Sequence, residues 1–220
     1  MPTIPLSHGG ASLWPGWLVS RPAPEPGPAG AEGTQLRVER DLVQRSLAGD
    51  GRAFASLVEP HLPMLHRIAM RASAGDHALA EDALQEALTL VYQRLERYTP
   101  GTSLRALLAA VAAQQARTLL RGEVRRRHRE DAAEPPEGTP SPAAAVSALR
   151  LAERIRTALA RLPRKQQEVA ILRLDGGLDD AEIAQAVGST AGAVRVHAHH
   201  AMKALRAELA DAVAQRGDPA

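Results

Sequence analysis

The sequence predicts an all-α protein made of two small helical domains joined by a flexible linker. Three observations lead to this fold class. The 220 residues are rich in Ala, Leu and Arg and contain only 2% aromatic residues, a composition that favours helices with aliphatic cores. Apolar residues recur at helical spacing, and no strand-like alternation is seen. A Pro-rich, mildly acidic stretch at 130–146 separates the two helical parts.

Composition excludes several classes of protein. The chain has no cysteine, which rules out a disulfide framework, a thiolate zinc site and a cysteine nucleophile. We find no P-loop, no Ser/His/Asp arrangement and no metal-ligand cluster, so we expect no enzyme activity, no cofactor and no metal. No apolar run approaches the roughly 18–20 residues of a membrane span, and the N-terminus lacks the features of a signal peptide. We therefore expect a cytoplasmic protein without membrane insertion.

The chain begins with a Pro- and Gly-rich segment, which predicts a disordered tail over 1–35. Trp14 and Trp17 lie in this tail, either as incidental aromatics or as part of a short peptide that docks on a partner. We expect a first helical domain over 36–129 and the linker over 130–146. A second helical domain over 147–212 and a short disordered tail over 213–220 complete the chain.

The first domain contains an amphipathic helix within "DHALAEDALQEALTLVYQRLERY". Apolar residues follow i, i+4, i+7, i+11 spacing on one face, and polar residues follow the same spacing on the opposite face. The apolar face consists of Leu84, Leu88, Val91 and Leu95, and the polar face of Asp82, Glu86, Thr89 and Gln93. Gln85 lies at the flank of the polar face.

After "TPGTS", a long helix is expected from about Ser103 to Arg127, apolar at first and strongly basic at its end. Arg117, Arg121 and Arg125 are spaced i, i+4, i+8, which suits contacts with successive phosphates of a nucleic acid. The alternative is a basic helix end that simply complements the helix dipole. The linker that follows could extend to about 50 Å, which suits two lobes that grip separate places on one large object.

The second domain carries a helix-turn-helix pattern in "DGGLDDAEIAQAVGSTAGAVRV". Asp179 and Glu182 form a capping-box arrangement at the start of the first helix. Gly188 permits the tight turn, and Thr190 caps the second, recognition helix. Small Ala184 suits the crossing of the two helices.

The recognition helix carries a cluster of histidines in "VRVHAHH". At 100° per residue, its buried stripe is expected to be Val194, Ala198, Ala201, Leu205 and Leu209. The outward side carries Arg195, Val196, His199, His200, Lys203 and Arg206, with His197 at the margin. This face of a helix-turn-helix enters the major groove, where His and Arg can donate to bases or phosphates. A metal site is disfavoured by the flanking cations, whereas a pH sensor or a plain solvated face remain alternatives.

The whole arrangement resembles a bacterial RNA polymerase sigma factor of the extracytoplasmic-function (ECF) group, over roughly residues 38–211. "AFASLVEPHLPMLHRIA" followed by "ALAEDALQEALTLVYQRLERY" is similar to the start of the region-2 domain of that family. "LPRKQQEVAILRLDGGLDDAEIAQAVGSTAGAVRVHAHHAMKALR" is similar to its region-4 domain. Two such blocks in this order, around a Pro-rich linker, make the resemblance specific.

The resemblance implies roles for individual residues. Asp82, Gln85 and Glu86 match the helix that docks on the clamp helices of core RNA polymerase. The residues expected to contact −10 promoter DNA are Tyr98, Arg105, Arg117, Arg121 and Arg125. The residues expected to contact −35 double-stranded DNA are Thr190, Arg195, Val196, His197, His199, His200 and Lys203. An anti-sigma factor is a further expected partner.

The chain departs from the family pattern in two places. The helix after the loop reads "LRALLA" where relatives carry aromatics, which leaves Tyr98 as the aromatic residue nearest the −10 element and puts efficient melting of DNA in doubt. Gln114 and Thr118 also replace residues that are usual there. His197 and His200 stand where relatives often have arginines, so we expect a different and more pH-sensitive −35 preference.

Three readings follow. The first is a sigma factor that binds core polymerase and directs it to a set of promoters. The second is a sigma-like decoy or modulator that binds an anti-sigma factor or the polymerase without melting DNA. The third is a stand-alone helix-turn-helix regulator whose first domain senses a signal or dimerises.

Overall fold

The computed structural model describes residues 31–100, 102–130 and 153–214, and these parts are helical apart from turns and one isolated bridge between Pro100 and Thr102. The predicted all-α class is therefore confirmed for the described residues. The proposed docking peptide around Trp14 and Trp17 lies outside them, as does nearly all of the predicted linker. No helix in the described ranges is long and apolar enough to cross a membrane.

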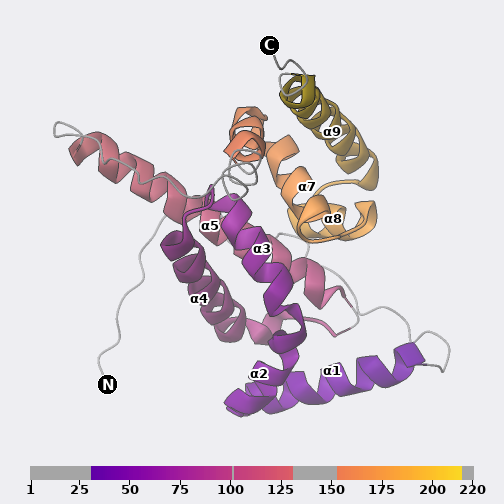
Figure 1. Cartoon of the computed structure of the whole chain (residues 1–220). Helices are drawn as coiled ribbons and strands as arrows, with labels where there is room; N and C mark the ends of the chain where they lie inside the picture. Colours follow the sequence, from indigo (N-terminus) through magenta and orange to yellow (C-terminus); the bar gives the residue numbers. More distant parts are fainter. Residues whose placement is uncertain (1–30, 101, 131–152, 215–220) are drawn as a thin grey trace.

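Helices α1 to α5 and the short 3-10 turns η2 and η3 make up the described residues of the N-terminal part, and Figure 1 shows how the helices are arranged. In chain order these are α1 (Ala31–Leu47), α2 (Gly51–Val58), η2 (Glu59–His61), α3 (Leu62–Ala72), α4 (His77–Gln93), η3 (Leu95–Arg97) and α5 (Leu104–Glu130). Helix α1 begins before residue 36, so the predicted tail of 1–35 extends too far toward the C-terminus. At its far end, α5 continues into the first residue of the predicted linker.

Aspartates start two of these helices in the way that capping rules require. The Asp50 carboxylate accepts hydrogen bonds from the backbone N–H groups of Arg52 and Ala53, and the Asp76 carboxylate accepts one from Leu79. Each bond satisfies a donor that the first turn of a helix leaves without a partner. The two caps therefore fix where α2 and α4 begin.

Helix α5 crosses α3 and α4 and forms the centre of the N-terminal domain (Figure 1). Its packed face is made of small side chains, which let the neighbouring helices approach closely. Ala106, Ala109, Ala112, Ala113 and Ala116 are all fully buried. This explains how a domain with so few aromatic residues still closes its core.

The C-terminal part contains a helix over 153–161, then α7 (Arg164–Leu174), α8 (Asp180–Val187) and α9 (Ala191–Ala214). Helices α8 and α9 form the predicted helix-turn-helix. The capping box is present, since the Asp179 carboxylate accepts from the Glu182 N–H at 2.8 Å and the Glu182 carboxylate accepts from the Asp179 N–H at 3.1 Å. Gly188 adopts the left-handed conformation with φ 63°, and Thr190 Oγ1 accepts from the Ala193 N–H. The local predictions for the motif are therefore confirmed.

The two domains lie against each other. Helices α7 and α8 contact α5, and α7 also contacts α3. One continuous cluster of buried apolar residues includes Ile68 and Leu107 from the first domain and Leu172 and Ile183 from the second. The two predicted helical domains are present, and in this conformation they share a core.

Candidate functional site

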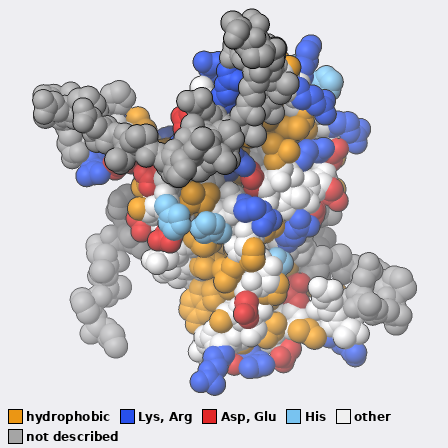
Figure 2. Space-filling model, in the orientation of Figure 1, with side chains coloured by type: hydrophobic (Ala, Val, Ile, Leu, Met, Phe, Trp, Pro, Cys, Tyr) orange, Lys and Arg blue, Asp and Glu red, His pale blue; other side chains and the backbone are white. Residues whose placement is uncertain are grey.

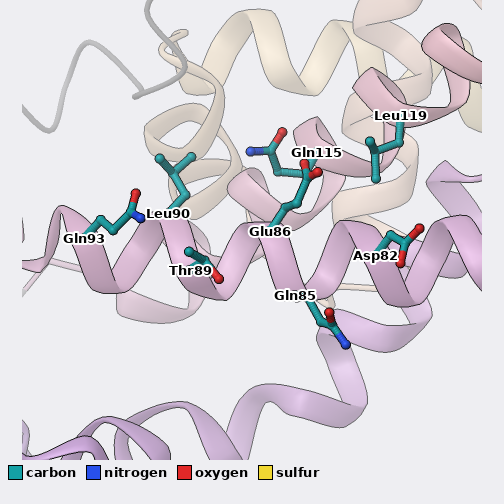
Figure 3. A pocket seen from close by; sticks show the side chains of 8 residues that line it. All are labelled: Asp82, Gln85, Glu86, Thr89, Leu90, Gln93, Gln115 and Leu119. Carbon is teal, nitrogen blue, oxygen red and sulfur yellow. The ribbon is translucent and has the colours of Figure 1, made fainter. Parts of the chain in front are cut away.

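The polar face of α4 borders a surface hollow of about 470 Å³ (Figure 3). Its lining residues come from α4 and from the middle of α5, and they are Asp82, Gln85, Glu86, Thr89, Leu90, Gln93, Gln115 and Leu119. The Glu86 side chain reaches toward Gln115, whereas Gln85 points away from α5 (Figure 3). The sequence placed the α4 residues on one face but gave no sign that α5 completes the hollow.

The hollow combines acidic, amide and apolar groups. Asp82, Gln85 and Glu86 are exposed, while Leu90 and Leu119 are half-buried beside them. Carboxylates around partly buried aliphatic side chains suit a protein surface that offers both cations and apolar contacts. The geometry therefore agrees with a docking face, although the docking role itself stays a prediction.

Tyr98, expected to contact −10 DNA, is a core residue with only 4% of its surface exposed. Its hydroxyl group lies 2.6 Å from Glu39 Oε1 and 2.8 Å from the Thr102 carbonyl oxygen. The pKa of the Tyr98 phenol is raised above its usual range. Burial of the phenol is the larger cause, and the nearby Glu39 carboxylate is the second. The ring therefore holds the loop before α5 to α1 and is not presented to DNA in this conformation. No pattern in the sequence pointed to Glu39.

The arginine row of α5 is not equally available along its length. Arg121 and Arg125 are exposed, as a row of phosphate contacts requires. Arg117 is only 8% exposed, and its Nη2 donates to Glu168 Oε1 of α7 at 2.7 Å. In this conformation an ion pair with the second domain buries Arg117, and its phosphate contact stays a prediction.

Arg105, at the start of α5, is also engaged by the second domain. Its Nη2 donates to the carbonyl oxygens of Gly176 and Gly177, the latter at 2.9 Å. Of the residues predicted to contact −10 DNA, Arg121 and Arg125 are thus exposed, whereas Tyr98 and Arg117 are buried and Arg105 is half-buried against the second domain.

The recognition helix α9 shows the predicted division into a buried and an exposed face. Val194, Ala198, Ala201 and Leu205 are buried. The exposed residues are Arg195, Val196, His199, His200, Lys203 and Arg206. His197 is half-exposed at the margin, as the helical wheel predicted. Figure 2 shows Lys and Arg side chains gathered on the part of the surface where α9 lies.

One aspartate that the sequence analysis did not single out connects the two helices of the motif. Asp180, at the start of α8, accepts from Arg195 Nε at 3.3 Å through one carboxylate oxygen and pairs with Arg173 of α7 through the other. The Arg195 side chain remains 74% exposed. Asp180 therefore restrains one end of a side chain that points to solvent on the recognition face.

The histidines do not gather with other metal ligands. The rings of His199 and His200 contact each other edge to face, with centroids 5.8 Å apart. In the described ranges no group of three or more His, Asp or Glu side chains could hold a metal ion. What the face offers is exposed hydrogen-bonding and cationic groups on a helix that can enter the major groove.

Comparison with known families matches both domains. The sigma-70 region 2 family matches residues 57–126, and the sigma-70 region 4 family matches residues 152–205. The first match covers α3, α4 and most of α5, and the second covers the helix-turn-helix.

Curated proteins and solved structures agree. The ECF RNA polymerase sigma factor SigD of Mycobacterium tuberculosis is 32% identical over 180 residues, covering 76% of this chain and 82% of SigD. ShbA of Streptomyces griseus, also an ECF sigma factor, is 31% identical over 178 residues, covering 76% of this chain and 92% of ShbA.

Two solved structures share the fold at 24% identity. CnrH in complex with the cytosolic domain of CnrY has a TM-score of 0.60, with 80% of this chain and 98% of CnrH covered. The sigma factor RpoE of Bartonella quintana, in complex with the anti-sigma factor NepR, has a TM-score of 0.56, with 71% and 96% covered. The chain belongs to the ECF group of RNA polymerase sigma factors.

Proposed function

We propose that this protein binds core RNA polymerase and directs it to promoters, with the hollow beside α4 as its polymerase contact. The basic side of α5 contacts the −10 element, and the exposed face of α9 reads the −35 element. The proposal is carried by one observation above all. A single chain combines an acidic face on α4 with a correctly capped helix-turn-helix whose outer face is basic.

The −35 contact is proposed to differ from an arginine-based one. An arginine fork can bind a guanine through two hydrogen bonds, which contributes about 1–3 kcal/mol of discrimination. A neutral imidazole offers one donor and one acceptor, so His197 and His200 cannot form that fork. Arg195, whose Nε donates to Asp180, is the arginine of this face that we propose for a base contact.

The proposed partners follow from the family and its relatives. The RpoE relative was solved with an anti-sigma factor, and we propose a protein of that class as a regulator of this chain. The protein acts in the cytoplasm by binding alone, and the polymerase performs the chemistry of transcription.

The test is reconstitution with purified core polymerase. The full-length protein should co-elute with the core enzyme and support run-off transcription from supercoiled promoter DNA. Co-elution without a transcript at any promoter of the source genome would favour the decoy reading. Sequence-specific DNA binding without co-elution would favour the stand-alone regulator. Either result would overturn the proposal.

A further inference from the structure

Two arginines of the second domain are joined by one carboxylate. Asp180, the first residue of α8, pairs with Arg173 of α7 through Oδ1 and accepts from Arg195 Nε of α9 through Oδ2 at 3.3 Å. These contacts connect all three helices of the second domain that are labelled in Figure 1. We call Arg173, Asp180 and Arg195 the Asp180 bridge.

The inner end of the Asp180 bridge is fixed by the core of the domain. Arg173 follows the fully buried Leu172 on α7, and its own side chain is 35% exposed. Its Nε is buried and has no hydrogen-bond partner among the described residues, so the charge of the guanidinium is compensated through the pair with Asp180. Because charged hydrogen bonds are strong and directional, this pair holds the Asp180 carboxylate in one place.

The outer end of the bridge is an arginine that points to solvent. The Arg195 side chain is 74% exposed, although its Nε donates to Asp180. Among the described residues, no acceptor lies within hydrogen-bond distance of its Nη1 and Nη2. A guanidinium is planar and carries its donors in a fixed fork, so a partner at Nε restrains the plane and leaves both terminal nitrogens for a second partner.

The position of Arg195 on α9 selects the kind of partner. It is in the second turn of the helix, which begins at Ala191, and the N-terminal residues of a recognition helix are those that contact base edges. Arg206, also exposed on this face, lies about three turns or ~16 Å further along the axis. The two terminal nitrogens of an arginine match O6 and N7 of guanine, so guanine is the base that this group recognises.

The carboxylate also argues against a phosphate as the partner of Arg195. A phosphate contact depends on positive charge and carries no sequence information, so it does not need a fixed guanidinium plane. Asp180 places a negative charge beside the arginine, which offsets part of its attraction for the DNA backbone. What Asp180 adds is orientation, and a base contact is the kind of contact that requires it.

We propose that Asp180 is a positioning residue for promoter recognition: it orients Arg195 through Nε so that the terminal nitrogens of Arg195 bind one guanine of the −35 element. This inference rests on the proposed function, because it assigns a specific base contact to the exposed face of α9. Ordering a long side chain at an interface opposes binding, and Asp180 supplies part of that order before DNA arrives. Asp180 itself does not contact DNA.

The test uses holoenzyme reconstituted from the full-length protein and core polymerase. The template is a supercoiled promoter that the wild type transcribes, with every position of the −35 element randomised, and the transcripts are counted by sequencing. The wild type should prefer guanine at one −35 position by about 5- to 150-fold, the range expected for one arginine fork on a guanine.

Asp180→Asn is the main variant. Asparagine has the size of aspartate but a single acceptor oxygen, so it cannot accept from Arg173 and Arg195 in the same way. The preference for that one guanine should fall about 2- to 13-fold, whereas preferences at the other −35 positions should stay unchanged. A merely structural role would change all preferences together.

Asp179→Asn is the matched control. It makes the same chemical change at the preceding residue, and asparagine still caps a helix. The Asp179 side chain accepts from the Glu182 N–H and belongs to the capping box, so the control should keep the wild-type guanine preference. Circular dichroism melting curves of both variants establish that they fold. Equal losses of guanine preference in Asp179→Asn and Asp180→Asn would overturn the inference.

The second arm combines Asp180→Asn with Arg195→Ala. Arg195→Ala should abolish the guanine preference at the same position, and Asp180→Asn should then have no further effect on base preference. An additional effect in the double variant would show that Asp180 acts by another route and would overturn the inference. Arg195→Ala that lowers transcription equally from every −35 sequence would identify a phosphate contact, with the same consequence.

Failure of the inference and failure of the proposed function give different results. If the wild-type holoenzyme transcribes but Asp180→Asn keeps the full guanine preference, the positioning role of Asp180 is wrong and the proposed function stands. Absence of transcription from the wild type at any promoter of the source genome would overturn the proposed function and with it the inference.

Discussion

Reversing one charge in the hollow beside α4 should separate polymerase binding from folding. Glu86 is exposed, so Glu86→Lys should change the free energy of unfolding by no more than about 0.5 kcal/mol. In a complex, the same carboxylate would be desolvated against the polymerase. Loss of a buried charged contact costs about 2–5 kcal/mol, so the dissociation constant for core polymerase should rise about 30-fold or more.

The assay is the change in fluorescence anisotropy of the labelled protein as core polymerase is titrated. Glu81→Lys is the matched control, because Glu81 is an exposed glutamate of the same helix outside the hollow. It should bind polymerase within about twofold of the wild type, since isolated exposed ion pairs contribute little. Equal affinities for Glu86→Lys and the wild type, or equal losses in both variants, would refute the assignment of this face.

Three further predictions concern the fold and the DNA-reading face. His200→Ala should weaken −35-dependent transcription and leave polymerase affinity unchanged; unchanged promoter selectivity in this variant and in His197→Ala would make both histidines part of a plain solvated face. Asp179→Ala removes one half of the capping box and should cost about 1 kcal/mol of stability, or about 2–4 °C in melting temperature by circular dichroism. The pKa of Tyr98 is raised in the folded state, so its contribution to stability is complete below about pH 10 and is lost as the pH rises further. Urea midpoints measured between pH 9 and 11 should therefore fall more steeply for the wild type than for Tyr98→Phe, and parallel curves would contradict the buried phenol.

The helix-turn-helix was predictable because short-range rules decide it. Asp179 with Glu182, Gly188 and Thr190 each act within a few residues, and the structure places them as the sequence indicated. The exposed face of α9 followed from helical spacing alone. Its proposed DNA contacts come from the family and remain predictions.

The relation between the domains could not be predicted in the same way. The Arg117–Glu168 pair joins residues far apart in sequence, on helices separated by a linker, and helical spacing carries no information on such a pair. The i, i+4, i+8 spacing therefore places three arginines in one row but does not reveal that one of them is buried. Arg117, the first arginine of the row, is buried because the second domain covers it.

The contact of Tyr98 with −10 DNA was expected from the resemblance to the family. Only the fold reveals that Glu39 and the Thr102 carbonyl group surround its hydroxyl group. With the ring buried and "LRALLA" in place of aromatics, the described residues of the loop before α5 and of the start of α5 present no exposed aromatic side chain in this conformation. Promoter opening is therefore the step of the proposed function that most needs a direct measurement.

The most direct measurement is permanganate reactivity of thymines around the −10 element in a complex of this protein, core polymerase and a supercoiled promoter. If the protein is a promoter-opening sigma factor, thymines there become reactive only when both proteins are present. A complex that forms on the promoter but leaves every thymine protected would contradict that claim.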